Sequence, residues 1–314
     1  MGRAAVWRND GRIGTAVSWR LRVARGLVRA LVRERYWGDE RALAQRARKL
    51  FGSPRPWAVL MSRGVTITAI AENGVRGEWL VPWDPHPGVL LYIHGGGYVS
   101  CSPMTHRPIT AALARRTRRR VLSVDYRLAP EHRFPAALDD VMAAYRVALA
   151  ATPRGVAVAG DSAGGGLALA LCERARTEGL PSPACVVCFS PWTDLTGSSE
   201  SVRANAERDA MFHPANIAQF ASAYLGTAPP RASLASPMFA APSKLPPSLF
   251  HVGAEELLLD DARLVHQRAR QSGSESYLRI FKGAFHAWQQ LYGVVPEATA
   301  SIAEASDFIH RHLD

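Results

Sequence analysis

One short segment of the sequence, VAVAGDSAGGG from Val156 to Gly166, sets a serine between glycines. Ser162 has Gly160 two residues before it and Gly164 two residues after it, which is the G-x-S-x-G pattern. An apolar, strand-like run precedes the pattern and a helix-forming run follows it. In that context the glycines permit a tight strand-to-helix turn that holds a serine hydroxyl above a sheet. The pattern therefore predicts that Ser162 is a nucleophile.

A serine hydroxyl is a poor nucleophile at neutral pH and needs a base that an acid orients. In this strand–turn–helix arrangement the partners follow in the order serine, acid, histidine. His286 lies in a loop directly after a predicted strand, where an imidazole can reach over the strand ends, so it is the expected base. The other histidines after Ser162 are expected within a strand, on helices or in an insertion: His213, His251, His266, His310 and His312.

The acid is expected in the loop that follows the predicted strand at 248–253. This loop and the residues after it offer four carboxylates. Asp260 and Asp261 are expected to begin the next helix, where acidic side chains suit the helix dipole. The residues alone therefore leave Glu255 and Glu256 as candidates.

Acyl transfer also needs hydrogen-bond donors for the oxygen that becomes negative. One donor is expected from the backbone N–H of Ala163, directly after the nucleophile. The others are expected from a glycine-rich loop after an earlier strand, and HGGG at 94–97 follows the apolar run LLYI. Three consecutive glycines leave a bare backbone that a substrate oxygen can approach.

Six segments between residues 94 and 288 together resemble one family, the bacterial hormone-sensitive-lipase-like esterases (family IV) of the α/β-hydrolase superfamily. They are HGGGYV, DYRLAPEHRFPAALDD, GDSAGGGLA, SPWTDL, VGAEELLLDD and FHAW. The resemblance implies Ser162 as nucleophile and His286 as base. It implies oxyanion donors at Gly96, Gly97 and Ala163, supported by the motif residues His94, Gly95 and Asp161.

The resemblance also selects the acid. Many relatives carry an Asp-Pro-Leu motif, and this chain has Glu256-Leu257-Leu258 at the matching place. The alignment of the motif favours Glu256 over Glu255. Within DYRLAPEHRFPAALDD, we expect Arg127, Glu131 and Asp139 to pair with one another and to support the site without a catalytic role.

The family resemblance implies a serine carboxylic-ester hydrolase that acts on small or short-acyl esters through an acyl-enzyme. An acetyl hydrolase, amidase or lactone hydrolase with the same triad is the alternative. A small-molecule receptor on the same scaffold is a remote third hypothesis, disfavoured because the serine, a loop acid and the histidine are all present. Neither a cofactor nor a metal is expected, and a homodimer stays open.

The charge of the chain is concentrated at one end. The formal net charge is +11, and residues 1–55 alone hold fourteen basic and four acidic residues, a net charge of +10. Arg22, Arg25, Arg29 and Arg33 share one face of a predicted helix, which we expect to pack on the domain with this face in solvent. Contact with a membrane surface or a polyanion is the alternative. The remaining chain is nearly neutral, so no nucleic-acid partner is expected.

The location of the protein follows from absent signals and few cysteines. No apolar stretch reaches the roughly 18–20 residues that a membrane span needs, and the N-terminus lacks a secretory pattern. Cys185 and Cys188 lie in a predicted strand at an odd separation, which places them on opposite faces and argues against a shared metal. We therefore expect a soluble, cytoplasmic protein with no stable membrane association.

Short apolar runs alternate with helical segments along the chain, which predicts an α/β fold with a mostly parallel sheet covered on both faces. With the resemblance, this becomes an α/β-hydrolase fold with a helical cap over the carboxyl ends of the strands. We expect an N-terminal helical arm at 1–60 that contributes to the cap, a catalytic core at 61–190 and 247–314, and a cap insertion at 191–246. In such sheets the site lies beyond the carboxyl ends of the strands.

Overall fold

A mostly parallel sheet forms the centre of the fold, which we describe from a computed structural model covering residues 11–13, 16–33, 38–53, 61–72, 74–241 and 243–314. Within these residues, nine strands lie in the order β1-β9-β8-β7-β6-β4-β5-β3-β2. All neighbours from β1 to β5 run parallel, and β3 and β2 add an antiparallel edge. The strands are β1 (Gly11–Ile13), β2 (Val65–Glu72), β3 (Val75–Pro82), β4 (Val89–Ile93), β5 (Arg120–Val124), β6 (Val156–Asp161), β7 (Val186–Phe189), β8 (Ser248–Gly253) and β9 (Ser276–Phe281).

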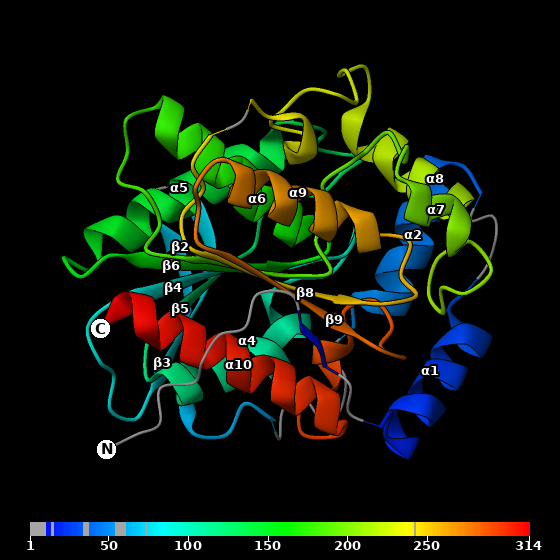
Figure 1. Cartoon of the computed structure of the whole chain (residues 1–314). Coiled ribbons are helices and arrows are strands. Elements are labelled where there is room, and N and C mark those ends of the chain that lie inside the picture. Colours follow the sequence, from blue (N-terminus) through cyan, green and yellow to red (C-terminus); the bar gives the residue numbers. More distant parts are fainter. Residues whose placement is uncertain (1–10, 14–15, 34–37, 54–60, 73, 242) are drawn as a thin grey trace.

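Helices cover both faces of the sheet (Figure 1). One face carries α5, α6 and α9, and the other carries α4 and α10, while α1, α2, α7 and α8 gather at one side. The predicted fold class is confirmed. The helices are α1 (Trp19–Leu31), α2 (Glu40–Phe51), α4 (Pro103–Thr117), α5 (Ala136–Ala150), α6 (Ala163–Thr177), α7 (Glu200–Ala204), α8 (Pro214–Leu225), α9 (Leu259–Gln271) and α10 (Pro296–Leu313), with 3-10 turns η1 (Pro237–Phe239) and η2 (Trp288–Leu291).

The central strands are buried on both faces because each face has its own core. On β4, Leu91 and Ile93 join the core on the side of α5 and α6, whereas Leu90 and Tyr92 join the core on the side of α4 and α10. This alternation is the two-residue period of a strand. It explains why the segment is apolar throughout instead of alternating with polar residues.

The two cysteines of the predicted strand at 184–190 confirm this geometry. Cys188 lies in the core beneath α5 and α6, and Cys185 lies in the core on the opposite face. Both are free thiols, and both are buried. Burial raises the pKa of each thiol, which keeps them protonated.

The expected pairing among Arg127, Glu131 and Asp139 is wrong. Arg127 instead forms a bidentate ion pair with Asp140, one residue beyond the expected partner. Each of the two acids reaches a different helix: Glu131 pairs with Arg48 on α2, and Asp139 pairs with an arginine on α6. The segment therefore ties α2 and α6 to the core instead of closing on itself.

The predicted N-terminal helical arm at 1–60 holds two helices in its described part and also strand β1, which was not predicted and pairs with β9 in the central sheet. Residues 1–10, 14–15, 34–37 and 54–60 lie outside the description. Side chains that precede each helix cap it. The Ser18 hydroxyl accepts a hydrogen bond from the backbone N–H of Leu21, and the Asp39 carboxylate accepts one from Ala42. Such caps satisfy N–H groups that a first helical turn leaves unpaired.

The arginine face of α1 does not lie free in solvent, and that expectation is wrong for three of the four arginines. Arg25 donates to the carbonyl oxygen of Arg208 at 3.0 Å, and Arg29 donates to that of Asp209 at 3.2 Å. Arg33 donates to the carbonyl oxygen of Ala206 at 2.5 Å. These carbonyl groups lie in the turn after α7, where the helix no longer supplies donors. Arginines of the arm therefore bind backbone carbonyl groups of the predicted cap insertion.

Candidate active site

A cavity of about 420 Å³ lies beyond the carboxyl ends of the parallel strands. Its floor is built by residues that directly follow five strands, which is the expected position for chemistry in this type of sheet. These residues are Gly96 and Gly97 after β4, Ser162 after β6, Trp192 after β7, Leu258 after β8, and Phe285 and His286 after β9. Among the histidines of the described residues, only His106 and His286 line this cavity.

Ser162 lies in the turn between β6 and α6 with φ 54° and ψ −123°, a conformation that is strained for a non-glycine residue. The flanking glycines allow this turn. A β-carbon on Gly164 would lie 2.0 Å from the carbonyl oxygen of Ile93, and one on Gly160 would lie 2.4 Å from the carbonyl oxygen of Gly164. Close approach of β4 and α6 therefore requires both glycines of the predicted pattern.

His286 and Glu256 form a buried pair. The imidazole Nδ1 lies 2.8 Å from Glu256 Oε2, and both side chains are almost fully buried. The other carboxylate oxygen, Oε1, accepts hydrogen bonds from the hydroxyl of Ser190 at 2.8 Å and from the backbone N–H of Gly253 at 2.5 Å. Glu255 points elsewhere and pairs with Arg25 of α1. Of the two glutamates that the residues left open, the structure places Glu256 against the histidine.

The Glu256 carboxylate can only accept, so His286 Nδ1 carries the proton that lies between them. The opposite nitrogen, Nε2, is buried and has no hydrogen-bond partner in the described part of the chain. Burial alone would lower the pKa of His286. The hydrogen bond and charge of Glu256, with the charges of Asp209 and Asp161, outweigh burial and raise this pKa above its ordinary value.

The loop after β4 lines the cavity with Gly96 and Gly97. Gly96 and Gly97 have φ of 111° and 61°, which only glycine adopts readily. Neither their N–H groups nor that of Ala163, the first residue of α6, donates to another described residue. The loop is closed by hydrogen bonds from Val99 and Ser100 to the Gly96 carbonyl oxygen.

Asp161 lies beneath this loop and joins it to the serine turn. Its carboxylate accepts hydrogen bonds from the Tyr92 hydroxyl at 2.7 Å and from the backbone N–H of Gly95 at 3.1 Å. His106 Nε2 lies 3.2 Å from the same carboxylate. Burial alone would raise the pKa of Asp161, but the charge and hydrogen bond of His106 and the Tyr92 hydroxyl outweigh it and lower this pKa.

His94 is not among the residues that line the cavity. Its Nδ1 donates to the carbonyl oxygen of Gly95 at 2.7 Å, and its ring stacks on Tyr126 with centroids 4.2 Å apart. Burial and the neighbouring charge of His106 lower the pKa of His94 to about 3. His94 is therefore neutral near pH 7 and is held against the glycine loop.

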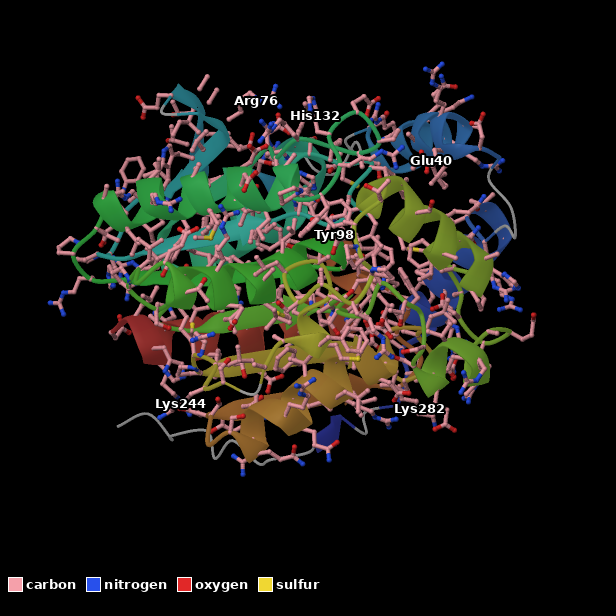
Figure 2. The ribbon with its side chains drawn as sticks, turned by 90° about the horizontal axis from the view of Figure 1, so that it is seen from above. Glu40, Arg76, Tyr98, His132, Lys244 and Lys282 are labelled. Atoms are coloured by element: carbon pink, nitrogen blue, oxygen red, sulfur yellow. The ribbon has the colours of Figure 1, made fainter. Side chains whose placement is uncertain are left out.

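The walls of the cavity come from the predicted arm and the predicted cap insertion. From α1 and α2 the walls receive Ala24, Leu27, Val28, Leu31, Val32, Leu50 and Phe51, and from 211–220 they receive Met211, Phe212, Ile217 and Phe220. Aromatic packing joins the insertion to the glycine loop, because Tyr98 stacks on Tyr224 of α8 with centroids 3.7 Å apart. Figure 2 shows Tyr98 in the interior, with Glu40 of α2 at the edge.

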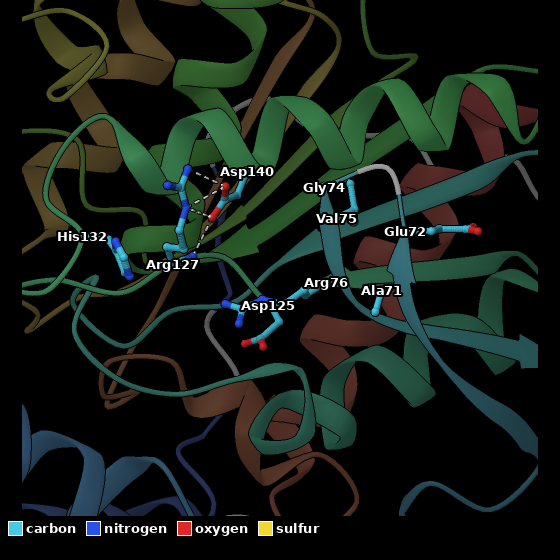
Figure 3. Close-up of a pocket in the computed structure, with 9 residues that line it drawn as sticks. All are labelled: Ala71, Glu72, Gly74, Val75, Arg76, Asp125, Arg127, His132 and Asp140. Carbon is cyan, nitrogen blue, oxygen red and sulfur yellow. Dashed lines mark hydrogen bonds and ion pairs between the residues drawn. The ribbon is translucent and has the colours of Figure 1, made fainter.

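A second cavity, of about 460 Å³, lies near the tip of the β2–β3 hairpin (Figure 3). Its charged and polar lining includes Arg76, Asp125 and His132, beside the Arg127–Asp140 ion pair. No serine, threonine or cysteine of the described residues lines it. The first cavity is therefore the candidate active site.

Three side chains that contact the site were not among the sequence-based candidates. Ser190 donates to Glu256, His106 pairs with Asp161, and Asp209 accepts from the backbone N–H of Leu257. Ser190 carried one signal, since it begins the SPWTDL segment. His106 and Asp209 carried none, because only the folded chain brings them to the site.

Two absences concern the described residues only. No three histidine, cysteine, aspartate or glutamate side chains among them gather as metal ligands. None of the helices in the described segments is both long enough and apolar enough to cross a membrane.

Comparison with known proteins identifies the family. Residues 90–290 match a family described as alpha/beta hydrolase fold. The chain is 40% identical to an acetyl-hydrolase of Streptomyces hygroscopicus over 74% of this chain and 78% of that protein. It is 34% identical to an esterase of Acinetobacter venetianus over 78% of this chain and 82% of that protein.

The solved structures agree. An esterase structure from the bacterial hormone-sensitive lipase family superposes with a TM-score of 0.83 at 36% identity, covering 96% of this chain and all of that one. The family match at 90–290 includes the glycine loop, the serine turn and the histidine loop. The chain belongs to the hormone-sensitive-lipase-like esterases of the α/β-hydrolase superfamily.

Proposed function

We propose that the protein is a serine carboxylic-ester hydrolase with Ser162 as nucleophile, His286 as base and Glu256 as the acid that orients it. One observation carries the proposal. Ser162 on its strained turn and His286, which is paired with the buried Glu256, line the same cavity, and the imidazole nitrogen that would take the proton has no partner among the described residues.

The reaction follows from these positions. Ser162 Oγ attacks the ester carbonyl carbon while its proton passes to His286 Nε2, and the N–H groups of Gly96, Gly97 and Ala163 stabilise the negative oxygen. The carbon–oxygen bond to the alcohol breaks, and the alcohol leaves with the proton from the imidazolium. Water then attacks the acyl-enzyme with the same base, which releases the carboxylic acid and restores Ser162.

Supporting residues hold these groups in place. Asp161 contacts the backbone N–H of Gly95, so it fixes the glycine loop relative to the serine turn. His94 braces the same loop through its hydrogen bond to Gly95. We propose that the arm helices and the insertion at 191–246 form the cap that excludes water from the reaction.

The lining of the cavity supports a proposal about the charge of the substrate. Its walls are mostly apolar, and no lysine or arginine of the described residues lines them. Burying a charged group without a partner costs free energy. Neutral esters are therefore favoured over anionic ones such as hemisuccinate esters, and among neutral esters we propose those with small or short acyl groups.

One alternative substrate class has a specific observation in its favour. The relative from Streptomyces hygroscopicus is named an acetyl-hydrolase. Acetylated metabolites, including amides, would use the same nucleophile, base and oxyanion donors, and so would lactones. Esters, acetylated amides and lactones would all use the same triad, so measured turnover rates must distinguish these substrate classes.

The experiment is a substrate panel: p-nitrophenyl esters of increasing acyl length, p-nitrophenyl hemisuccinate, an acetylated amide and a lactone. We expect the highest kcat/KM with a short neutral acyl ester and loss of nearly all activity in Ser162→Ala. A folded protein that turns over none of the esters would contradict the proposal. Preference for the amide or the lactone would select the alternative.

A further inference from the structure

The cap insertion grips the loop that carries Glu256. Ser201, Asn205 and Asp209 are spaced four residues apart along α7 and the turn after it, and all three are buried. The Ser201 hydroxyl donates to the carbonyl oxygen of Leu257 at 2.7 Å, and the Asn205 amide donates to that of Glu256 at 2.9 Å. The carboxylate oxygen Oδ2 of Asp209 accepts from the backbone N–H of Leu257 at 2.8 Å. Hydrogen bonds from the insertion therefore hold the carbonyl groups of Glu256 and Leu257 and the N–H group of Leu257.

Asp209 is the member of this set that also reaches the histidine side of the site. Its second oxygen, Oδ1, accepts from the backbone N–H of Met211 at 2.7 Å and from that of Phe212 at 2.9 Å. The Phe212 ring lies edge-on to the His286 ring, with centroids 5.1 Å apart and an interplanar angle of 70°. The Asp209 carboxylate therefore fixes both the loop that carries Glu256 and the position of Phe212 beside the His286 ring.

The geometry points to Asp209 as a positioning residue for the Glu256–His286 pair, an inference that rests on the proposed function. Helix α1 contacts the turn that carries Asp209 from its outer side. Arg29 donates to the Asp209 carbonyl oxygen, and Arg25 pairs with Glu255, which precedes the acid in the chain. Displacement of this turn would move the acid loop and the Phe212 wall together, and catalysis is sensitive to displacements of this kind.

The charges near the Glu256–His286 pair allow the role of Asp209 to be measured through the pKa of His286. The negative charges of Glu256, Asp209 and Asp161 act on His286, and each favours its protonated form. Arg25 and Arg208 are engaged by Glu255 on the outer side of the turn. Burial raises the pKa of Asp209 itself, and its three backbone donors oppose that effect. Removing the Asp209 charge should therefore lower the pKa of His286.

The test compares Asp209→Asn with the matched control Asp194→Asn. Asp194 is also buried in the insertion and accepts hydrogen bonds from backbone N–H groups of Thr196 and Ser198, but its carboxylate does not contact the acid loop in the described structure. The measurements are the His286 imidazole pKa by NMR titration, with the resonance identified from a His286→Gln variant, and kcat and KM with a short-acyl ester. Melting temperatures report the structural loss in both variants.

In Asp209→Asn we expect a lower His286 pKa and a kcat reduced about tenfold, as when other outer supports of a site are removed, with a small change in KM. In Asp194→Asn we expect neither. An unchanged His286 pKa and an unchanged kcat, with a melting-temperature loss equal to that of the control, would overturn the proposal.

A second variant guards against misfolding of Asp209→Asn. Asn205→Ala removes donors to the carbonyl oxygens of Ala254 and Glu256 without changing charge. In Asn205→Ala we expect a reduced kcat and an unchanged His286 pKa. A wild-type kcat would contradict a positioning role for the set formed by Ser201, Asn205 and Asp209. If wild-type protein turns over no ester, the proposed function fails, whereas the NMR titration still decides whether Asp209 sets the environment of His286.

Discussion

At the scale of single residues, the site depends on the different roles of the two imidazole nitrogens of His286. Nδ1 of His286 is committed to Glu256, so only Nε2 remains to accept a proton. The same carboxylate that orients the ring also raises its pKa against the effect of burial. The raised pKa makes His286 a stronger base, but it also keeps the imidazole protonated at low pH, where activity is then lost.

The pH profile follows from this sign. A raised pKa means that His286 stays protonated to a higher pH than an ordinary histidine, whose pKa is about 6.5. Because only the neutral imidazole accepts a proton, kcat/KM should fall as pH decreases through a value above 6.5. His94, with a pKa of about 3, cannot produce such a limb. An acid limb well below pH 6 would show that His286 is not the base.

Two adjacent glutamates provide a direct comparison. Glu256→Gln keeps the size of the side chain but replaces the carboxylate on His286 Nδ1, and we expect kcat to fall at least about a hundredfold. Glu255→Gln removes the charge that pairs with Arg25, and we expect kcat within about threefold of wild type. Steady-state kinetics on both variants decide the matter. Equal losses would show that Glu256 has no special role.

The sequence could predict Ser162 and His286 because their motifs are local. The tight turn needs glycines at fixed distances, and the histidine loop follows a strand directly. Asp209 could not be predicted, because its partner Leu257 is 48 residues away. Contacts of that kind depend on how the insertion folds back, which no local pattern records.

At the scale of elements, the turn between β6 and α6 is fixed by backbone contact. Gly164 lies so close to β4 that a β-carbon would meet two carbonyl oxygens, those of Ile93 and His94. The Ser162 conformation follows from this close packing. The turn therefore stores strain that the surrounding sheet must compensate.

Glycine substitutions test this interpretation. Gly164→Ala should destabilise the fold by more than about 3 kcal/mol, because backbone atoms on β4 would have to move. Gly26→Ala is the matched control: it lies within α1, and a β-carbon there would meet nothing within 4 Å. It should stabilise the protein by about 0.5–1 kcal/mol, since glycine is a poor helix former. Urea denaturation measures both, and a mild Gly164→Ala would contradict the close-packing argument.

The longer elements could be predicted from the sequence, and the shortest could not. Apolar runs of five or six residues, such as the segment of β4, and helical periods of a dozen or more residues are strong signals. Helix α7 has 5 residues and β1 has 3, too few to show a period. The place of α7 in the fold depends on a contact that is distant in the chain, the hydrogen bond from Ser201 to the carbonyl oxygen of Leu257.

At the scale of the whole molecule, segments far apart in the chain close one cavity. The arm supplies the wall at 24–32, the core supplies the serine and the histidine, and the insertion supplies the opposite wall. Part of the positive charge of the arm has a structural role, since three of its arginines bind carbonyl groups of the insertion. A basic N-terminus therefore does not by itself indicate a polyanionic partner here.

Removal of the arm tests its contribution to the cavity. Deletion of residues 1–35 removes α1 and the edge strand β1. We expect weaker discrimination between short and long acyl chains from the loss of α1, together with a lower melting temperature. Trp19→Ala is the control, because Trp19 is 64% exposed on α1 and does not line the cavity. An acyl-length profile unchanged by the deletion would contradict a role for the arm in the cap.

The central claim is that Ser162 carries the acyl group during turnover. The most direct measurement is mass spectrometry of protein quenched during the hydrolysis of a p-nitrophenyl ester, followed by peptide mapping. We expect the mass of the acyl group on the peptide that contains Ser162, and no such adduct in Ser162→Ala. Turnover of the ester by Ser162→Ala at the wild-type rate, or an acyl adduct confined to another residue, would contradict the account.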